Sequence, residues 1–309
     1  MKFRDYEDTS DNVELLYKNM YINQTYKLKK NIVNKLKFDK QYKIKDVFPL
    51  LNKVIDSSDP DISLPQIIHG YQTAEAIKQE LFDNDKLKTI NIIDLFSKEE
   101  WFLLDDKYKN LYNTTLVKFY DYIKDWNWLI LIGLIHDLGK ILVLDEFGKF
   151  DEWFSVGDIY PLGCKFDSSN IFYDKNYHKL CSDYSESEFN VNNIDYYGVY
   201  KKKCGFCNIE MTFSHDYYLS ESLSKSNTNL PIEAIYIIRY HSFYSWHTPR
   251  NNIRGYITLA DETDWKYLPL LKLFQKFYLN SKNDDKSDNF NYVYYDKLIQ
   301  KYIPNSILL

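Results

Sequence analysis

A histidine and an aspartate lie side by side in a strongly apolar part of this 309-residue sequence, "LIGLIHDLGKIL" at 131–142. The leucines and isoleucines there favour burial, whereas His136 and Asp137 need water or a strong partner. A neutral imidazole and a carboxylate are good ligands for a metal such as iron, and a carboxylate can bridge two ions. A satisfied core histidine at a helix end is the alternative interpretation.

Lys140 follows His136 by one helical turn. A continuous helix would therefore present both side chains on one face. An ammonium group beside a metal site is well placed to hold an oxyanion or an alkoxide, or to relay its proton. The spacing thus predicts that Lys140 has a catalytic role if the metal site exists.

Four of the six histidines stand at the apolar edge of an expected helix: His69, His136, His215 and His241. Four such imidazoles are difficult to satisfy separately by ordinary hydrogen bonds. A shared metal centre would satisfy all of them, so the sequence predicts that they converge. The other two histidines, His178 and His247, lie in polar or loop-like sequence and are expected to be structural.

Cys204 and Cys207 form a lone CxxC motif. A zinc site needs two more ligands, and a thioredoxin-like site needs a flanking strand and helix, neither of which is evident. Four cysteines in so long a chain indicate a reducing compartment without a disulfide framework. No P-loop, dinucleotide-binding or nucleophile-elbow motif is present.

The overall charge balance disfavours nucleic acid as a partner. The formal net charge is −5, and no strongly basic region stands out. The N-terminal residues 1–12 are charged and lack the apolar core of a signal peptide. Residues 128–144 are apolar but contain His136, Asp137 and Lys140, which favours a buried helix over a membrane span. We expect a soluble cytoplasmic protein that acts without a membrane partner.

Hydrophobic periodicity predicts helices over most of the chain, and strand alternation is scarce. The clearest helical segments are 46–56, 67–82, 126–144, 232–244 and 268–279. We therefore expect an all-α fold in which residues 1–309 form a single domain. Residues 83–125 are aromatic and charged, lack a candidate ligand cluster, and are predicted to form a helical insertion, hereafter called the insertion.

Eight motifs in a fixed order resemble the myo-inositol oxygenase family, a di-iron branch of the HD-domain superfamily. They are "FRDY" (3–6), "DSSDPD" (56–61), "HGYQTAEAIK" (69–78), "LIHDLGK" (134–140), "VGDIYPLGC" (156–164), "CGFCNIEMTFSHDYY" (204–218), "IRYHSFYSWHT" (238–248) and "KYIPNSIL" (301–308). The resemblance runs almost from end to end, with the insertion as the unmatched part. It implies a helical, HD-domain-like, monomeric cytosolic enzyme. Such an enzyme holds two iron ions per chain and uses O2 to cleave myo-inositol to D-glucuronate.

Carried over by position, the resemblance implies a ligand set for two irons. His69 and His136 would bind one iron, His215 and His241 the other, with Asp137 bridging both. Further positions would hold the substrate: Arg4, Asp56, Lys140, Gly157, Asp158, Ser242 and Lys282. A polyol needs several such carboxylate, ammonium and hydroxyl partners to be oriented in a mostly dry pocket.

One ligand position departs from the family pattern. The family reads Phe-Asp-Leu-Tyr-Thr-Lys where this chain reads "FYLNSK" at 277–282, so Tyr278 replaces an aspartate that completes the first iron's ligands. Asp261 and Asp264 lie more than three helical turns earlier and cannot simply substitute. Three outcomes are open: a phenolate ligand, a water in that position, or loss of the first iron and of catalysis.

Two other functions compete with the oxygenase. A metal-dependent phosphohydrolase of the HD type would use the same His-Asp pair, although "FRDY", "VGDIYP" and "HSFYSWHT" weigh against it. A non-catalytic binding protein would retain the fold and could use the insertion as a partner surface.

Overall fold

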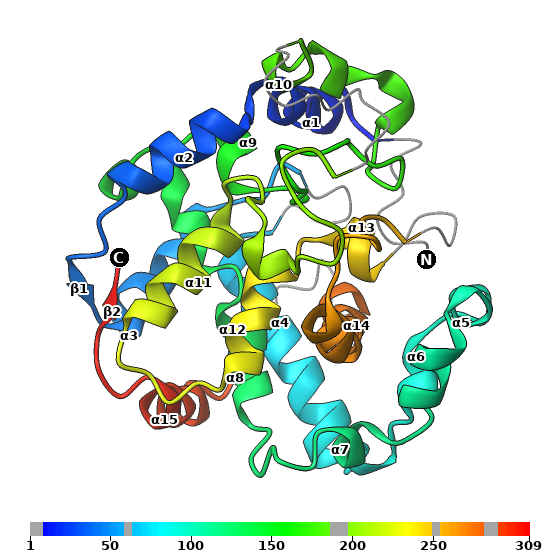
Figure 1. Cartoon of the computed structure of the whole chain (residues 1–309). Helices are drawn as coiled ribbons and strands as arrows, with labels where there is room; N and C mark the ends of the chain where they lie inside the picture. The colour runs from blue at the N-terminus through cyan, green and yellow to red at the C-terminus, as the bar shows by residue number, and fades with distance from the viewer. Residues whose placement is uncertain (1–8, 59–63, 186–196, 249–253, 281–289) are drawn as a thin grey trace.

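The computed structural model describes residues 9–58, 64–185, 197–248, 254–280 and 290–309 and is mainly helical (Figure 1). The α-helices are, in chain order, α1 (Asp11–Asn23), α2 (Tyr26–Lys35), α3 (Ile44–Val47), α4 (Gln66–Ile77), α5 (Lys98–Leu103), α6 (Asp106–Leu111), α7 (Leu116–Phe119), α8 (Trp128–Ile135), α9 (Glu152–Ser155), α10 (Ser182–Ser185), α11 (His215–Lys225), α12 (Ile232–Tyr240), α13 (Tyr244–His247), α14 (Glu262–Asn280) and α15 (Tyr292–Tyr302). Tighter or wider turns add the 3-10 helices η1 (Phe48–Lys53), η3 (Leu87–Thr89), η4 (Ile92–Leu95), η5 (Leu138–Val143), η6 (Asp145–Phe147), η7 (Tyr173–Lys175), η8 (Tyr177–Leu180) and η9 (Phe206–Asn208), and the π-helical turn η2 (Lys78–Asp83).

Within the described residues, the strands are limited to β1 (Gln41–Tyr42) and β2 (Ile307–Leu308). They pair antiparallel, which ties the C-terminal end of the chain to the segment after α2. One buried apolar cluster extends from α1 to β2. The prediction of an all-α single domain is therefore confirmed. Among the described residues, no helix is both long enough and apolar enough to cross a membrane.

The expected helix over 126–144 is shorter than predicted. α8 ends at Ile135, His136 is its C-cap, and Asp137 adopts φ −91° and ψ 2° before the chain continues as η5. His136 and Lys140 therefore do not share one face of a continuous α-helix, and that expectation is wrong. Packing against α11 explains the change, because a Cβ on Gly139 would lie 2.3 Å from the His215 carbonyl oxygen. A tight contact with α11 thus fixes the backbone just after the His-Asp pair.

The other expected helices are found with changed ends. The segment 46–56 divides into α3 and η1, and 67–82 becomes α4 followed by η2. In the segment 232–244, α12 ends at Tyr240 and α13 begins at Tyr244, whereas 268–279 lies inside the longer α14.

Two glycines let α4 and α8 cross closely at the centre of the molecule. A Cβ added to Gly70 would lie 2.5 Å from the Leu134 carbonyl oxygen, and one added to Gly133 would lie 3.1 Å from the Ala74 Cα. Every residue of α8 is buried, as its uniformly apolar sequence requires. The close crossing brings the C-terminal end of α8 beside the middle of α4.

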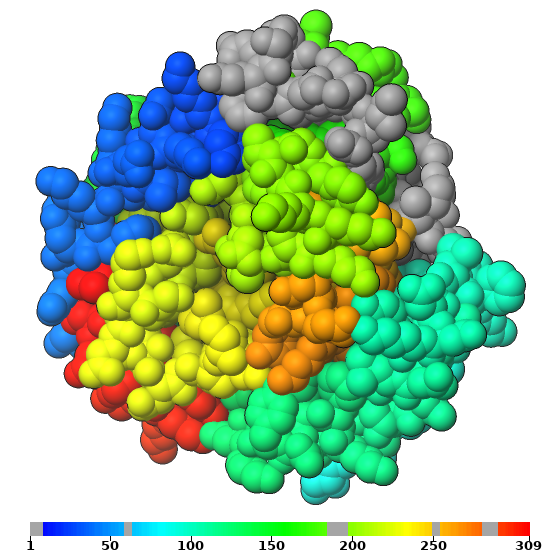
Figure 2. All heavy atoms as spheres, viewed as in Figure 1, coloured from blue at the N-terminus to red at the C-terminus, as the bar shows by residue number. Residues whose placement is uncertain are grey.

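The insertion forms a lobe of its own at the surface. Its helices α5, α6 and α7 lie outside the central helices at the lower right of Figure 1, and Figure 2 shows this lobe beside α14. Tyr108 stacks on Trp265 with 3.9 Å between ring centroids, and the Tyr112 hydroxyl donates to the Trp265 carbonyl oxygen. The lobe is thus attached to the beginning of α14.

Replacing Gly70 by alanine tests the close crossing of α4 and α8. In an exposed helix this change would stabilise the protein, because alanine is the better helix former. Here the added methyl group meets a backbone oxygen, so we expect the free energy of unfolding to fall by about 1–3 kcal/mol. Thermal and denaturant unfolding measure the change. A rise in stability would contradict the crossing.

Candidate metal centre

Two groups of buried side chains are arranged as metal ligands, and Asp137 belongs to both. The first group is His69, His136 and Asp137, and the second is Asp137, His215 and His241. The ligand atoms within each group lie within 4.8 Å of one another. The four histidines that the sequence predicted to converge are therefore brought together, from α4 and from the ends of α8, α11 and α12.

Each oxygen of Asp137 faces one pair of imidazoles. Its Oδ2 lies 3.2 Å from Nε2 of His136 and 3.9 Å from Nε2 of His69. Its Oδ1 lies 3.3 Å from Nε2 of His215 and 3.6 Å from Nε2 of His241. This is the arrangement of a carboxylate that can bridge two ions.

The other ring nitrogens orient three of these imidazoles. Nδ1 of His136 lies 2.9 Å from the Gly133 carbonyl oxygen, and Nδ1 of His241 lies 2.9 Å from that of Ile238. Nδ1 of His215 lies 2.6 Å from the carbonyl oxygen of Ser155 in α9. Because a carbonyl oxygen only accepts, each Nδ1 carries the proton and donates it. In the neutral form of each ring the Nε2 lone pair then faces Asp137, which is the tautomer that a metal ligand needs.

The second group shows directly that these residues suit a cation. Nε2 of His215 and Nε2 of His241 lie 3.2 Å apart. At that distance the two nitrogens can share one cation, either a proton donated from one ring to the other or a metal ion bound by both. In the described part of the chain, His136 Nε2 and Asp137 Oδ1 are also buried without a hydrogen-bond partner. The donor set therefore fits transition-metal ions.

The local charges favour a cation at His215. Burial alone would lower the pKa of His215, but the Asp216 and Asp137 carboxylates raise the pKa to about 9. For Asp137, burial would raise the pKa, yet His136 and Lys140 hold it well below its usual range. A site that favours a proton on an imidazole also favours a metal ion there, because both are positive.

Lys140 connects the first group to two more polar side chains. Its Nζ donates to Asp137 Oδ2 at 2.9 Å, to Asp56 Oδ2 at 2.8 Å and to Gln66 Oε1 at 2.9 Å. Burial opposes the charged form, but the two carboxylates raise the pKa of Lys140 above its ordinary value. The ammonium group is thus kept charged beside the candidate metal site, although the helical geometry expected for it is absent.

Three further predicted substrate positions, Gly157, Asp158 and Ser242, lie in the loop after α9 or directly after His241. Asp158 is buried and accepts a hydrogen bond of 2.8 Å from Tyr17. The backbone N–H of Ile159 donates to the Ser242 carbonyl oxygen at 3.0 Å. Gly157 adopts a φ of +88°, which favours glycine. The loop after α9 and the residue after His241 are therefore joined next to the His215 and His241 rings.

Asp216 is a candidate ligand that the sequence did not predict. It is fully buried, and its Oδ1 lies 2.7 Å from His215 Nε2 and 3.6 Å from His241 Nε2. Ser242 donates to both of its oxygens, through its N–H at 3.1 Å and its hydroxyl at 3.0 Å. The signal was present in "SHDYYL", which has the same His-Asp order as "IHDLGK".

Tyr278 lies at the first group, at the position where the resemblance to the family implies aspartate. The side chain is buried, and its ring centroid lies 4.8 Å from that of His69 and 5.3 Å from that of His136. Two other predicted substrate positions, Arg4 and Lys282, lie outside the described residues.

The residues expected to be structural lie outside both groups. His178 is buried and stacks on Phe166, and His247 is fully buried with Nε2 at 2.9 Å from the His241 carbonyl oxygen. Cys204 is a half-buried free thiol and Cys207 an exposed one, and neither of the two candidate metal groups includes them.

The fold and the site together define a helical protein that gathers buried histidines and aspartates around candidate metal positions. A sequence model of the family described as myo-inositol oxygenase matches residues 10–117 and 107–309, two segments that overlap at 107–117. Together they include the insertion, which the motifs had left unmatched. The chain is 37% identical to an inositol oxygenase of Dictyostelium discoideum over 99% of this chain and 89% of that protein. It is 36% identical to inositol oxygenase 2 of Arabidopsis thaliana and 34% identical to a probable inositol oxygenase of Oryza sativa subsp. japonica, over 98% of this chain and 81% and 83% of those proteins. The chain belongs to the myo-inositol oxygenase family.

Replacing Asp137 by asparagine tests the shared carboxylate. The change keeps the shape but removes the charge and one ligand oxygen from both groups. Changes outside the ligand shell cost about 10–100-fold in metal affinity, so we expect the loss of a shared ligand to cost at least that for every bound ion. Equilibrium dialysis against Co²⁺ measures it.

The matched control is Asp158→Asn. It removes another buried carboxylate that lies outside the two groups, and it should bind Co²⁺ as the wild type does. Equal binding by the Asp137→Asn protein would contradict the arrangement.

Proposed function

We propose that this chain is a di-iron oxygenase that uses O2 to cleave the ring of myo-inositol to D-glucuronate. The observation that carries the proposal is the Asp137 carboxylate between two pairs of imidazoles, in a chain of the myo-inositol oxygenase family. The overall reaction balances with one oxygen atom of O2 retained in the acid and the other released as water. His69 and His136 would hold one iron, and His215 and His241 the other.

When bound, the irons supply electrons to O2 and polarise the reacting substrate oxygen. The chain's own residues bind and orient the polyol. Asp56 and Lys140 lie on the side of the first group, and Asp158 and Ser242 lie on the side of the second. Arg4 and Lys282 complete the proposed set of substrate contacts.

Lys140 is the proposed catalytic cation. Its charge is maintained by Asp56 and Asp137, so it can stabilise a developing substrate alkoxide or carry its proton. Its hydrogen bond to Gln66 fixes the direction of the ammonium group. A buried lysine held in this way acts as a fixed charge rather than as a flexible surface side chain.

Loading the purified chain with iron under anaerobic conditions tests the activity. We expect O2 uptake that depends on myo-inositol, with D-glucuronate as the product. Lys140→Met should lower kcat/KM by about 10²–10⁴-fold, the range typical of a group that transfers or stabilises a proton.

The control Lys149→Met removes an exposed lysine paired with Asp145 and should leave kcat/KM unchanged. An iron-loaded wild type that consumes no O2 with myo-inositol would reject the proposal.

The tyrosine at position 278, where the resemblance implies aspartate, leads to a separate prediction. The ring lies edge-on to the His69 and His136 rings, so we propose that its phenolate replaces the family's aspartate at the first iron. Protein oxidised to the ferric state should then show a visible charge-transfer band that Tyr278→Phe removes.

Tyr218→Phe is the control, because the ring of this buried tyrosine packs against Phe38. A band that persists in Tyr278→Phe would rule out the phenolate.

A further inference from the structure

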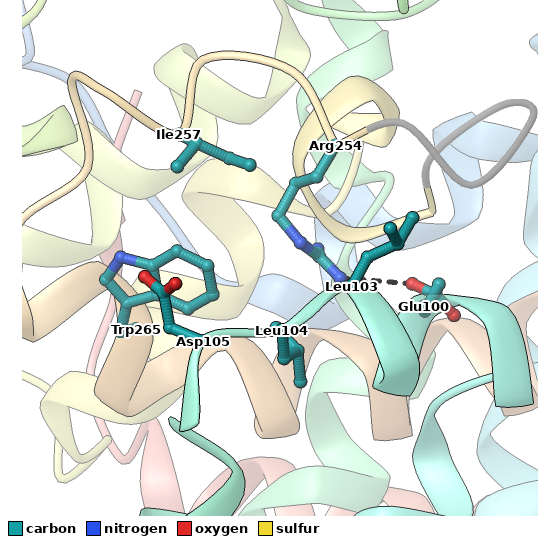
Figure 3. A pocket seen from close by; sticks show the side chains of 7 residues that line it. All are labelled: Glu100, Leu103, Leu104, Asp105, Arg254, Ile257 and Trp265. Carbon is teal, nitrogen blue, oxygen red and sulfur yellow. Dashed lines mark hydrogen bonds and ion pairs between the residues drawn. The ribbon is translucent and has the colours of Figure 1, made fainter. Parts of the chain in front are cut away.

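The insertion is joined to the core through a buried carboxylate. Glu100, on α5, accepts two hydrogen bonds from Lys272 Nζ, at 2.8 and 3.0 Å, and one from Arg254 Nη2 at 3.0 Å. The three side chains are 9%, 7% and 5% exposed, although they come from distant parts of the sequence. Figure 3 shows Glu100 and Arg254 facing each other at a cavity of about 300 Å³, between the insertion and the beginning of α14.

The fold of the insertion itself holds this carboxylate in place. The Glu100 side chain accepts from the N–H of Ser97 at 3.0 Å, while the Ser97 hydroxyl accepts from the N–H of Glu100 at 3.1 Å. This reciprocal pair is a capping box at the start of α5. The position of the Glu100 charge is therefore set by a helix end that belongs to the insertion.

Lys272 links Glu100 to a backbone oxygen of the core. Besides Glu100, its Nζ donates to the His247 carbonyl oxygen at 3.0 Å. The imidazole of His247 in turn lies with Nε2 2.9 Å from the His241 carbonyl oxygen and with Nδ1 2.9 Å from the Thr248 hydroxyl. Because a carbonyl oxygen only accepts, His247 carries a proton on Nε2 and donates a hydrogen bond through it to the backbone carbonyl oxygen of His241.

The hydrogen bonds that run from Glu100 through Lys272 and His247, here called the path, end at His241, a residue of the second group. The His241 carbonyl oxygen also accepts from Gln275 Nε2 at 2.5 Å, and the His241 ring is fixed through Nδ1 to Ile238. Lys272 and Gln275 are three residues apart on α14 and so lie on one side of that helix. The backbone and the ring of His241 are thus held by separate hydrogen bonds. The hydrogen bonds to its backbone oxygen come from Gln275 on α14 and from His247.

We propose that the insertion positions the metal centre: Glu100, acting through Lys272 and His247, fixes the orientation of the His241 imidazole. Glu100, Lys272 and His247 are positioning residues, since none of them touches a candidate metal position. The inference rests on the proposed function only in taking His241 as a metal ligand. Partners beyond the ligand shell orient metal-bound imidazoles in this way and typically change metal affinity by about 10–100-fold.

Removing the Lys272 charge tests the path with the smallest disturbance. Lys272→Met leaves Glu100 paired with Arg254, so no buried charge is left alone, whereas Glu100→Gln would leave two buried cations facing each other. Lys272→Gln, which keeps a shorter polar side chain, serves if the methionine variant does not fold.

The matched control breaks another link between the insertion and α14. Lys107 and Glu262 form an exposed ion pair, with side chains 59% and 69% exposed, that touches none of the residues in the path. Lys107→Met should therefore change neither readout described below.

Two measurements decide the inference. In metal-free protein labelled with ¹⁵N-histidine, the Nε2 proton of His247 should exchange with water about tenfold faster in Lys272→Met than in the wild type. In a Co²⁺ titration followed by visible absorption, the ion at the second group should bind about tenfold more weakly, while the first is unchanged.

Lower thermal stability of Lys272→Met with wild-type proton exchange and wild-type Co²⁺ affinity would overturn the inference. A wild type that binds no metal would instead reject the proposed function, and the proton exchange of His247 would still decide whether the insertion holds His247 and His241.

Discussion

The structure depends on a carboxylate buried among four imidazoles. Asp137 is 1% exposed, and two further carboxylates, Asp56 and Asp216, are buried nearby. The buried ammonium group of Lys140 lies between Asp137 and Asp56. Three negative charges and one positive charge leave an excess negative charge in the interior, which is costly unless cations neutralise it. Metal ions bound to the imidazole nitrogens would supply that charge and would also occupy the lone pairs. The chemistry proposed for the site and the neutralisation of the buried cluster would then use the same cations.

Helix ends and close helix crossings bring these groups together. His136 and His241 are C-caps of α8 and α12, and His215 is the first residue of α11, so their rings are oriented by the chain where it leaves a regular helix. Close contacts at Gly70 and Gly139 allow the neighbouring backbones to approach within the distance that the imidazoles need. A bulkier residue at these points would separate the ligands, and at Gly139 it would do so by meeting the backbone of His215 itself. The packing of the central helices is thus part of the site.

The sequence predicted the ligands better than the backbone that carries them. Polar side chains in apolar surroundings can be recognised one by one, which is why the four histidines and Asp137 were found. The end of α8 at Ile135 depends on contact with α11, and the roles of Gln66 and Asp216 depend on which side chains meet in the folded chain. Such tertiary contacts override the periodicity that predicted one helix over 126–144. The insertion was recognisable as a separate segment, but its capping box and buried carboxylate gain meaning only from the cations of the core.

The helix α14 connects the insertion to Tyr278 and to the second group. The insertion rests on its beginning through Trp265 and reaches its middle through Lys272, and Tyr278 near its end lies against the first metal group. Gln275, between them, supports His241 in the second group. A change in the position of α14 would therefore alter both groups at once, with Tyr278 moving at one and His241 at the other.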